Sequence, residues 1–168
     1  LNGVLGIGHT RWATHGGVTV PNAHPHRSGN VAVVHNGIIE NFRDIREEME
    51  AAGLSFESQT DTESVVVLTR HHMDQGATPL EAVRQTAQRL EGAFALCFLF
   101  DGEGDLMIGT RKGAPLAVGY GDGENFIGSD ALALAPMTNR LSYLEDGDIA
   151  VVTRTSVAIY DREGRPAN

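Results

Sequence analysis

Apolar residues recur at helical spacing in three consecutive segments in the middle of the chain. The first segment runs from Asn41 to Gly53, where Phe42, Ile45 and Met49 lie three or four positions apart. This spacing places the three side chains on one face of a helix, and a glycine is a common C-terminal cap. The pattern therefore predicts an amphipathic helix that ends at Gly53.

Two more helices are predicted directly after it. The second is expected to begin at Thr60 or Asp61, either of which can cap it, and to end near Gly76. The third begins at Thr78-Pro79, because proline is well tolerated at the first helical position. Their apolar faces are expected to comprise Val65, Val66, Leu68 and Met73 in the second helix, and Leu80, Val83, Ala87 and Leu90 in the third.

Short apolar runs separated by turn residues make up the rest of the chain. In the first 37 residues, VLGIGH (4–9) and VAVVHNG (31–37) alternate with Gly, Pro and Asn, which is typical of strands joined by loops. After Gly92 we expect seven strands and one short helical turn at residues 130–137. The expected strands span residues 93–100, 105–111, 115–120, 125–129, 140–145, 148–153 and 156–161. Strands, then helices, then strands predict an α+β fold with antiparallel sheets.

Composition narrows the class of protein. A chain of 168 residues that is 41% apolar can bury one core, so we expect a single domain over residues 1–168, with residues 162–168 beginning a linker. A net charge of -9 disfavours binding to nucleic acid. No apolar stretch approaches the roughly 20 residues of a membrane helix, and the first residues lack the pattern of a signal peptide. These features predict a cytoplasmic protein that binds no membrane.

Polar side chains concentrate in the run GHTRWATHG (8–16). The planar guanidinium of Arg11 suits a carboxylate, Thr14 adds a hydroxyl group, and the glycines allow the backbone to approach a ligand. These features favour a binding loop for a small anion. The alternative is a surface arginine beside a half-buried Trp12.

Two further candidates have equally simple structural interpretations. Asn36 and Gly37 follow an apolar run, and an asparagine amide beside a glycine N–H can form an oxyanion hole; Asn-Gly is also a common hairpin turn. Asp61 stands at a helix start, where it can act as the N-terminal cap. It can instead bind a ligand's ammonium group, which with Arg11 would suit an amino-acid zwitterion.

Five of the seven histidines, His9, His15, His24, His26 and His35, fall in the first 35 residues. They raise the alternative of a metal site. No HExxH run and no carboxylate at helical spacing from a histidine supports it, and an extended His-Pro-His segment would point its two rings apart. Hydrogen-bonding roles are favoured for these rings, and no metal is expected.

Cys97 is the only cysteine, and it lies in the apolar run AFALCFLF (93–100). An apolar setting raises the pKa of a thiol and hides it from solvent. We therefore interpret Cys97 as a core residue and not as a nucleophile. A single cysteine also excludes an internal disulfide framework, which favours a reducing compartment.

The order and spacing of GHTRWATHG, NAHPH (22–26), VHNGIIEN (34–41) and TDTE (60–63) resemble the glutaminase domains of the glucosamine-6-phosphate synthases, the glutamine:fructose-6-phosphate aminotransferases. The resemblance continues through residues 114–134 and 143–153. Amidophosphoribosyltransferases share the arginine loop and an Asn-Gly pair, but the combination of RWATHG with HNGIIEN favours the former enzymes.

This resemblance implies an N-terminal-nucleophile hydrolase fold, a four-layer αββα sandwich, and no cofactor. It also implies roles for seven residues by position. Arg11 would bind the α-carboxylate of L-glutamine, Asp61 its α-ammonium group, Thr14 and His15 would add contacts, Asn36 and Gly37 would form the oxyanion hole, and Trp12 would gate the passage of ammonia.

The same resemblance implies an N-terminal cysteine nucleophile, whereas this sequence begins with Leu1. We therefore expect a sandwich that lacks its N-terminal part, and an isolated chain without glutaminase activity. The parent protein would be a homodimer that makes glucosamine 6-phosphate and glutamate, with fructose 6-phosphate bound by a sugar-isomerase region outside these residues. Two alternatives stay open: another class II glutamine amidotransferase, of the purine pathway, or a non-catalytic module that binds amino acids.

Overall fold

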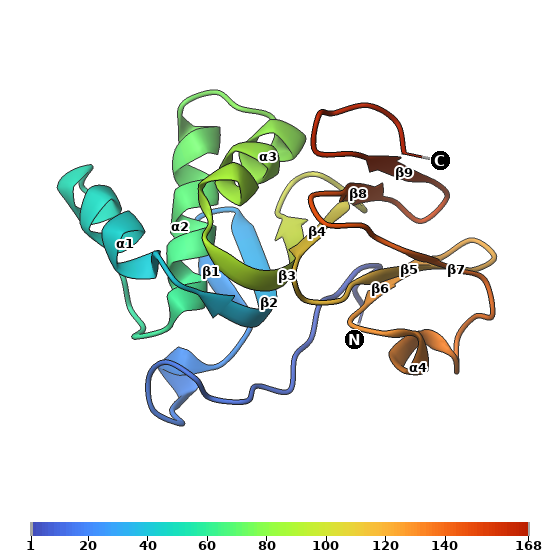
Figure 1. Cartoon of the computed structure of the whole chain (residues 1–168), viewed down its shortest axis with the longest axis horizontal. Coiled ribbons are helices and arrows are strands. Elements are labelled where there is room, and N and C mark those ends of the chain that lie inside the picture. Colours follow the sequence, from blue (N-terminus) through green and yellow to red (C-terminus); the bar gives the residue numbers. More distant parts are fainter. Residues whose placement is uncertain (1, 168) are drawn as a thin grey trace.

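Three helices cover one face of a large sheet in the computed structural model, which describes residues 2–167 (Figure 1). They are α1 (Phe42–Ala51), α2 (Asp61–Asp74) and α3 (Pro79–Arg89), and they confirm the three predicted helices. Leu1 and Asn168, the ends of the expected domain and linker, lie outside the described residues. No helix in the described part of the chain is long and apolar enough to cross a membrane.

The helix ends follow from their local sequence. Gly53 has a φ of +88°, and its N–H donates to the carbonyl of Glu50, which ends α1 as the glycine cap predicts. At the start of α2, the hydroxyl of Thr60 accepts the N–H of Glu63. The N-terminal cap is therefore Thr60 and not Asp61. At the start of α3, Thr78 and Glu81 form a capping box, in which each side chain accepts the backbone N–H of the other residue.

Within residues 2–167, the larger sheet has six antiparallel strands in the order β1-β2-β3-β4-β8-β9. The smaller sheet has the order β6-β5-β7, and all seven strands predicted after Gly92 are confirmed. The larger sheet consists of β1 (His26–Ser28), β2 (Val31–Ile39), β3 (Gly92–Phe100), β4 (Met107–Lys112), β8 (Ile149–Val152) and β9 (Val157–Tyr160). The smaller one consists of β5 (Ala117–Tyr120), β6 (Asn125–Gly128) and β7 (Leu141–Tyr143), and the short helices are η1 (Val20–Asn22) and α4 (Ala131–Leu134).

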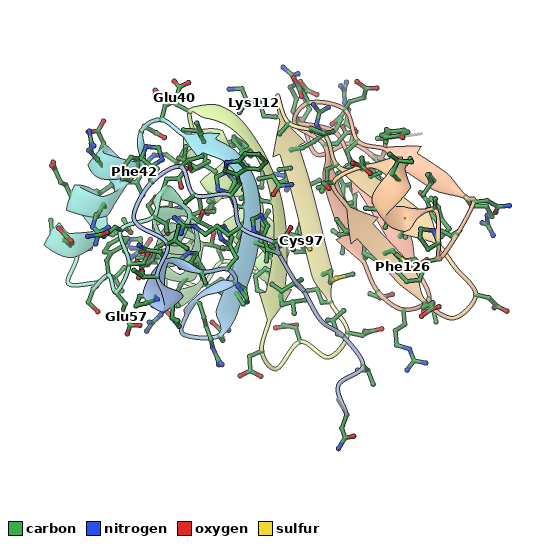
Figure 2. The ribbon with its side chains drawn as sticks, turned by 90° about the horizontal axis from the view of Figure 1, so that it is seen from below. Glu40, Phe42, Glu57, Cys97, Lys112 and Phe126 are labelled. Atoms are coloured by element: carbon green, nitrogen blue, oxygen red, sulfur yellow. The ribbon has the colours of Figure 1, made fainter. Side chains whose placement is uncertain are left out.

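Strand β3 separates two hydrophobic cores. Its even-numbered side chains, Phe94 to Phe100, pack beneath the helices, whereas Ala95 and Cys97 face the smaller sheet. Alternation of side chains along a strand therefore explains why the run AFALCFLF is apolar throughout: both of its faces are buried. In Figure 2, Phe42 lies on the helical side of the larger sheet and Phe126 lies in the smaller sheet.

The layers are helices, larger sheet, smaller sheet and α4. On the smaller sheet, Val118 belongs to the core between the sheets. A Cβ added at Gly119 or Gly128 would meet the side chain of Leu134, so α4 packs on the opposite, outer face. This is the expected αββα order, with a single helical turn as the fourth layer.

The strand predicted at VLGIGH (4–9) is wrong. No residue from Asn2 to Thr19 is in a strand, although Leu5 and Ile7 are half-buried against the core between the sheets. The alternating pattern arises because one side of an extended segment packs on this core. Alternation reports which side is buried, and it does not report whether the backbone is paired in a ladder.

Candidate functional site

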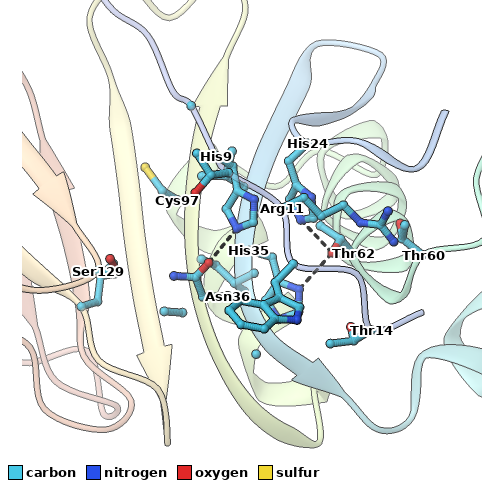
Figure 3. Close-up of a pocket in the computed structure, with 18 of the residues that line it drawn as sticks. His9, Arg11, Thr14, His24, His35, Asn36, Thr60, Thr62, Cys97 and Ser129 are labelled. Carbon is cyan, nitrogen blue, oxygen red and sulfur yellow. Dashed lines mark hydrogen bonds between the residues drawn. The ribbon is translucent and has the colours of Figure 1, made fainter. Parts of the chain in front are cut away.

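A cavity of about 730 Å³ lies among residues 8–15, strands β2 and β3, the first residues of α2, and residues 127–129 of the smaller sheet (Figure 3). The larger sheet and α2 form the inner wall of this cavity, and the N-terminal segment forms its rim. All seven site residues predicted from the sequence line this one cavity: Arg11, Trp12, Thr14, His15, Asn36, Gly37 and Asp61.

Arg11 holds the shape of its own loop. Its Nη2 donates to the carbonyls of His15 and Gly16 at 2.7 and 3.1 Å, and its Nη1 donates to the carbonyl of Gly17 at 2.9 Å. A guanidinium has five N–H donors, so these bonds leave donors for a ligand. The sequence suggested either a ligand-binding role or a surface arginine, and the loop-closing role of Arg11 was missed.

Two other residues of this loop, Trp12 and Thr14, are more exposed. Trp12 is 91% exposed, so the alternative interpretation, which placed a half-buried tryptophan beside the arginine, is wrong about Trp12. Thr14 is exposed as well, and His15 packs edge-on against the ring of Phe42 with the ring centres 4.9 Å apart. An exposed indole at the rim is available to contact a ligand or another part of a larger protein.

Asn36 and Gly37 do not form a hairpin turn. They lie inside β2, where Gly37 pairs with Phe94 of β3. Gly37 has a φ of +115°, and a Cβ at this position would lie 2.1 Å from the carbonyl oxygen of Ala93. The close approach of the two strands therefore requires a glycine, and it leaves the adjacent Asn36 side chain at the cavity.

Asp61 is the first residue of α2 and is only 3% exposed. Its Oδ2 accepts the backbone N–H of Ile39 at 2.8 Å. The interpretation of Asp61 as the N-terminal cap is wrong, because Thr60 fills that position. A buried carboxylate at the first turn of a helix is stabilised by the helix dipole, and here it lies at the cavity wall.

The histidines gather on one side of the cavity. The rings of His9 and His24 stack with centres 4.1 Å apart, and the rings of His24 and His26 meet edge to face at 5.0 Å. The expectation that His24 and His26 point apart is therefore wrong, because the two rings are in contact. Within residues 2–167, no group of three or more His, Cys, Asp or Glu side chains is arranged to hold a metal ion.

Thr62 links two of these histidines, although it was not among the site residues predicted from the sequence. Its hydroxyl contacts Nε2 of His24 at 3.1 Å and Nδ1 of His35 at 2.9 Å. Burial, together with a smaller effect of the neighbouring His9, lowers the pKa of His24 to about 3. Burial also lowers the pKa of His35 to about 4, against the opposing effect of Asp61. Both rings are therefore neutral at pH 7.

Cys97 also borders the cavity, but it belongs to the core between the sheets. It is 7% exposed, and burial raises the pKa of its thiol to about 12. The interpretation of Cys97 as a core residue is confirmed. At neutral pH its sulfur is a thiol and not the nucleophilic thiolate.

Comparison with known proteins gives a consistent result. A family model described as a glutamine amidotransferase domain matches residues 19–136. The glutamine–fructose-6-phosphate aminotransferase (isomerizing) of Brucella abortus biovar 1 is 59% identical over 166 residues, which are 99% of this chain and 27% of that protein. The chain thus spans about a quarter of the length of this curated relative.

Two solved structures have a similar fold. The glutamine phosphoribosylpyrophosphate amidotransferase of B. subtilis has a TM-score of 0.74 at 23% identity, with 92% of this chain and 34% of that chain covered. A glutamine aminotransferase class-II domain protein from Silicibacter pomeroyi has a TM-score of 0.62 at 18% identity, with 89% and 74% covered. These likenesses confirm the expected fold, the α+β sandwich of the N-terminal-nucleophile hydrolases.

Proposed function

The chain belongs to the glutamine amidotransferase domain family, and on that basis we propose that its cavity binds glutamine for hydrolysis. The observation that carries this proposal is the placement of Arg11, Asp61 and Asn36 on one cavity. A cation, a buried anion and an amide around a single space are the groups that an amino acid with a side-chain amide requires.

Glutamine would bind through its charged backbone groups. The remaining N–H donors of Arg11 suit the α-carboxylate, and the buried carboxylate of Asp61 suits the α-ammonium group. Thr14 and His15 lie on the same loop and would add contacts at the rim. Because each charge meets an opposite charge, the cavity would favour a zwitterion over a simple amide.

The hydrolysis would proceed by acyl transfer. A thiolate attacks the side-chain amide carbon of glutamine, ammonia leaves, and water then releases glutamate from the thioester. Negative charge develops on the carbonyl oxygen in the tetrahedral intermediate. Asn36 Nδ2 and the N–H of Gly37 would stabilise it, and removal of one such donor commonly lowers kcat by about 10²–10³-fold.

The attacking thiol would come from outside these 168 residues. Cys97 is the only cysteine in the sequence, and its buried thiol stays protonated. An N-terminal cysteine fits the chemistry, because an α-amine has a pKa near 8 and can take the proton from its own thiol. The isolated chain would therefore hydrolyse no glutamine.

We further propose that the parent protein transfers the ammonia to fructose 6-phosphate, giving glucosamine 6-phosphate. Support comes from the 59% sequence identity to an aminotransferase named for that sugar. The sequence identity to the glutamine phosphoribosylpyrophosphate amidotransferase of B. subtilis is only 23%, and that likeness concerns the fold alone. Trp12, exposed at the rim, would gate the passage of ammonia. A homodimer in the cytoplasm, with the sugar bound by a separate isomerase region, completes this proposal.

Assay of the full-length gene product with two acceptors tests it. With glutamine and fructose 6-phosphate, we expect glutamate and glucosamine 6-phosphate in equal amounts. With glutamine and phosphoribosyl pyrophosphate, we expect no amine transfer. Phosphoribosylamine formation without glucosamine 6-phosphate would contradict the proposed acceptor, and absence of glutamate under all conditions would contradict the proposed hydrolysis.

A further inference from the structure

The side chain of Asn36 meets a histidine at one end and the open cavity at the other. Oδ1 of Asn36 lies 2.6 Å from Nε2 of His9. In Figure 3 the amide nitrogen of Asn36 points away from His9, into the space between Asn36 and Ser129. An asparagine amide has a donor end and an acceptor end, so the contact with His9 decides which of the two faces the cavity.

His9 is itself held in place. Its ring stacks on His24 with an interplanar angle of 22°. His24 contacts the hydroxyl of Thr62, which also contacts His35, the residue that precedes Asn36 in β2. The chain His9, His24, Thr62 and His35 therefore leads back to the backbone of Asn36. A side chain fixed in this way can orient its neighbour with little freedom to rotate.

From this geometry we infer that His9 is a positioning residue, which donates from Nε2 to Oδ1 of Asn36 and so directs the amide N–H groups of Asn36 into the cavity. This inference rests on the proposed glutamine hydrolysis, in which that amide stabilises the oxyanion. His9 would act on the reaction through Asn36 and would not touch the substrate.

The tautomer of His9 determines which end of the Asn36 amide faces the cavity. With the proton on Nε2, the ring donates to Asn36 and the cavity receives N–H donors. With the proton on Nδ1, Nε2 can only accept, so the Asn36 amide would turn over and present its oxygen to the cavity. Among the described residues, Nδ1 of His9 is buried without a hydrogen-bond partner. A proton there would be a buried donor without an acceptor, which disfavours this tautomer.

Two substitutions of His9 separate its donor from its ring. His9→Phe keeps a flat ring that can stack on His24 but removes the donor, whereas His9→Gln keeps an amide N–H that can donate to Asn36. In the full-length protein, we expect His9→Phe to lower kcat for glutamate release by about 10–100-fold, with KM for glutamine little changed. We expect His9→Gln to restore most of the lost activity.

A double-mutant cycle then tests whether His9 acts through Asn36. In an Asn36→Ala background, His9→Phe should lower kcat by less than about twofold, because the group that it positions is absent. The same loss in both backgrounds would overturn the inference, and so would a His9→Gln variant as impaired as His9→Phe. His71→Phe is the matched control, since His71 lies ten residues beyond Asp61 along α2, about 15 Å away.

Nitrogen-15 NMR of the His9 ring shows which ring nitrogen carries the proton, and it does not require an active enzyme. We expect the proton on Nε2 in the chain itself, and a proton on Nδ1 would overturn the inference. The kinetic measurements distinguish the proposed glutamine hydrolysis from the proposed positioning role of His9. A wild-type protein that releases no glutamate would contradict the proposed function, whereas an active wild type with an equally active His9→Phe variant would contradict only the positioning role.

Discussion

The carboxylate of Asp61 accepts the backbone N–H of Ile39 at 2.8 Å, and this bond joins the first turn of α2 to the last residue of β2. The bonded strand residue lies two positions after Gly37. The bond therefore fixes the relative position of the proposed ammonium-binding group and the proposed oxyanion hole. A single buried side chain has both a structural and a proposed binding task, and two substitutions can separate them.

Asp61→Ala removes both tasks, whereas Asp61→Asn removes only the charge. We expect Asp61→Ala to lower the free energy of unfolding by about 1–3 kcal/mol, because the N–H of Ile39 becomes a buried donor without an acceptor. Asp61→Asn keeps an oxygen acceptor and should be more stable than Asp61→Ala. In the full-length protein, both should raise KM for glutamine at least about tenfold, since each removes the charge that is proposed to face the ammonium group. Urea denaturation and glutamate release measure the two effects. Equal stabilities of the two variants, or an unchanged KM in Asp61→Asn, would count against this assignment.

Gly37 should tolerate no side chain. Gly37→Ala should lower the free energy of unfolding by about 3 kcal/mol or more, because its Cβ would lie 2.1 Å from the carbonyl oxygen of Ala93 at a φ of +115°. Gly53→Ala is the control: its φ is +88°, but no atom lies within 4 Å of the added Cβ. It should cost only about 1 kcal/mol. Chemical denaturation of both variants checks this prediction, which similar losses at the two positions would refute.

Cys97 should be chemically inert in the folded chain. Burial raises the pKa of its thiol to about 12, so almost no thiolate forms at pH 8. We expect iodoacetamide to leave the native chain unmodified at pH 8 and to label it fully in urea. Mass spectrometry reads the result without ambiguity because the sequence holds one cysteine. Rapid labelling of the native chain would show that the thiol is accessible.

Stability should decrease as the pH falls below about 6.5. The folded state lowers the pKa of His24 to about 3 and that of His35 to about 4, whereas an unfolded histidine titrates near 6.5. Between pH 6.5 and 4 the unfolded chain therefore binds more protons than the folded chain, and the free energy of unfolding falls. Urea denaturation at several pH values measures the slope. His24→Gln should reduce it. A stability that is constant between pH 7 and 5 would contradict this prediction.

The sequence predicted most of the elements because local chemistry determines them. The glycine after α1 and the capping box before α3 mark helix ends in the sequence itself, and the uniformly apolar run from Ala93 to Phe100 indicates a strand buried on both faces. It predicted seven of the residues that line the cavity, chiefly through the family resemblance. It did not predict the partners of those residues, because a bond such as that between Asp61 and Ile39 joins positions 22 residues apart.

The sequence failed where tertiary packing overrides a local pattern. Asn36-Gly37 reads as a turn, yet both residues continue β2 because Phe94 pairs with Gly37 across the sheet. The alternation in residues 4–9 reads as a strand, yet it reflects packing of one side on the core. Thr62 gave no sign of its role, since its two histidine partners come from distant parts of the chain.

Glutamate release tests the central claim most directly, in a comparison of the 168-residue chain with the same chain preceded by the proposed N-terminal segment. We predict that the extended protein releases glutamate from glutamine and loses this activity when its N-terminal cysteine is replaced by alanine. We predict that the 168-residue chain releases none, with or without Cys97→Ala. Glutamate release by the 168-residue chain alone would contradict the account, because no thiol in it is free to attack.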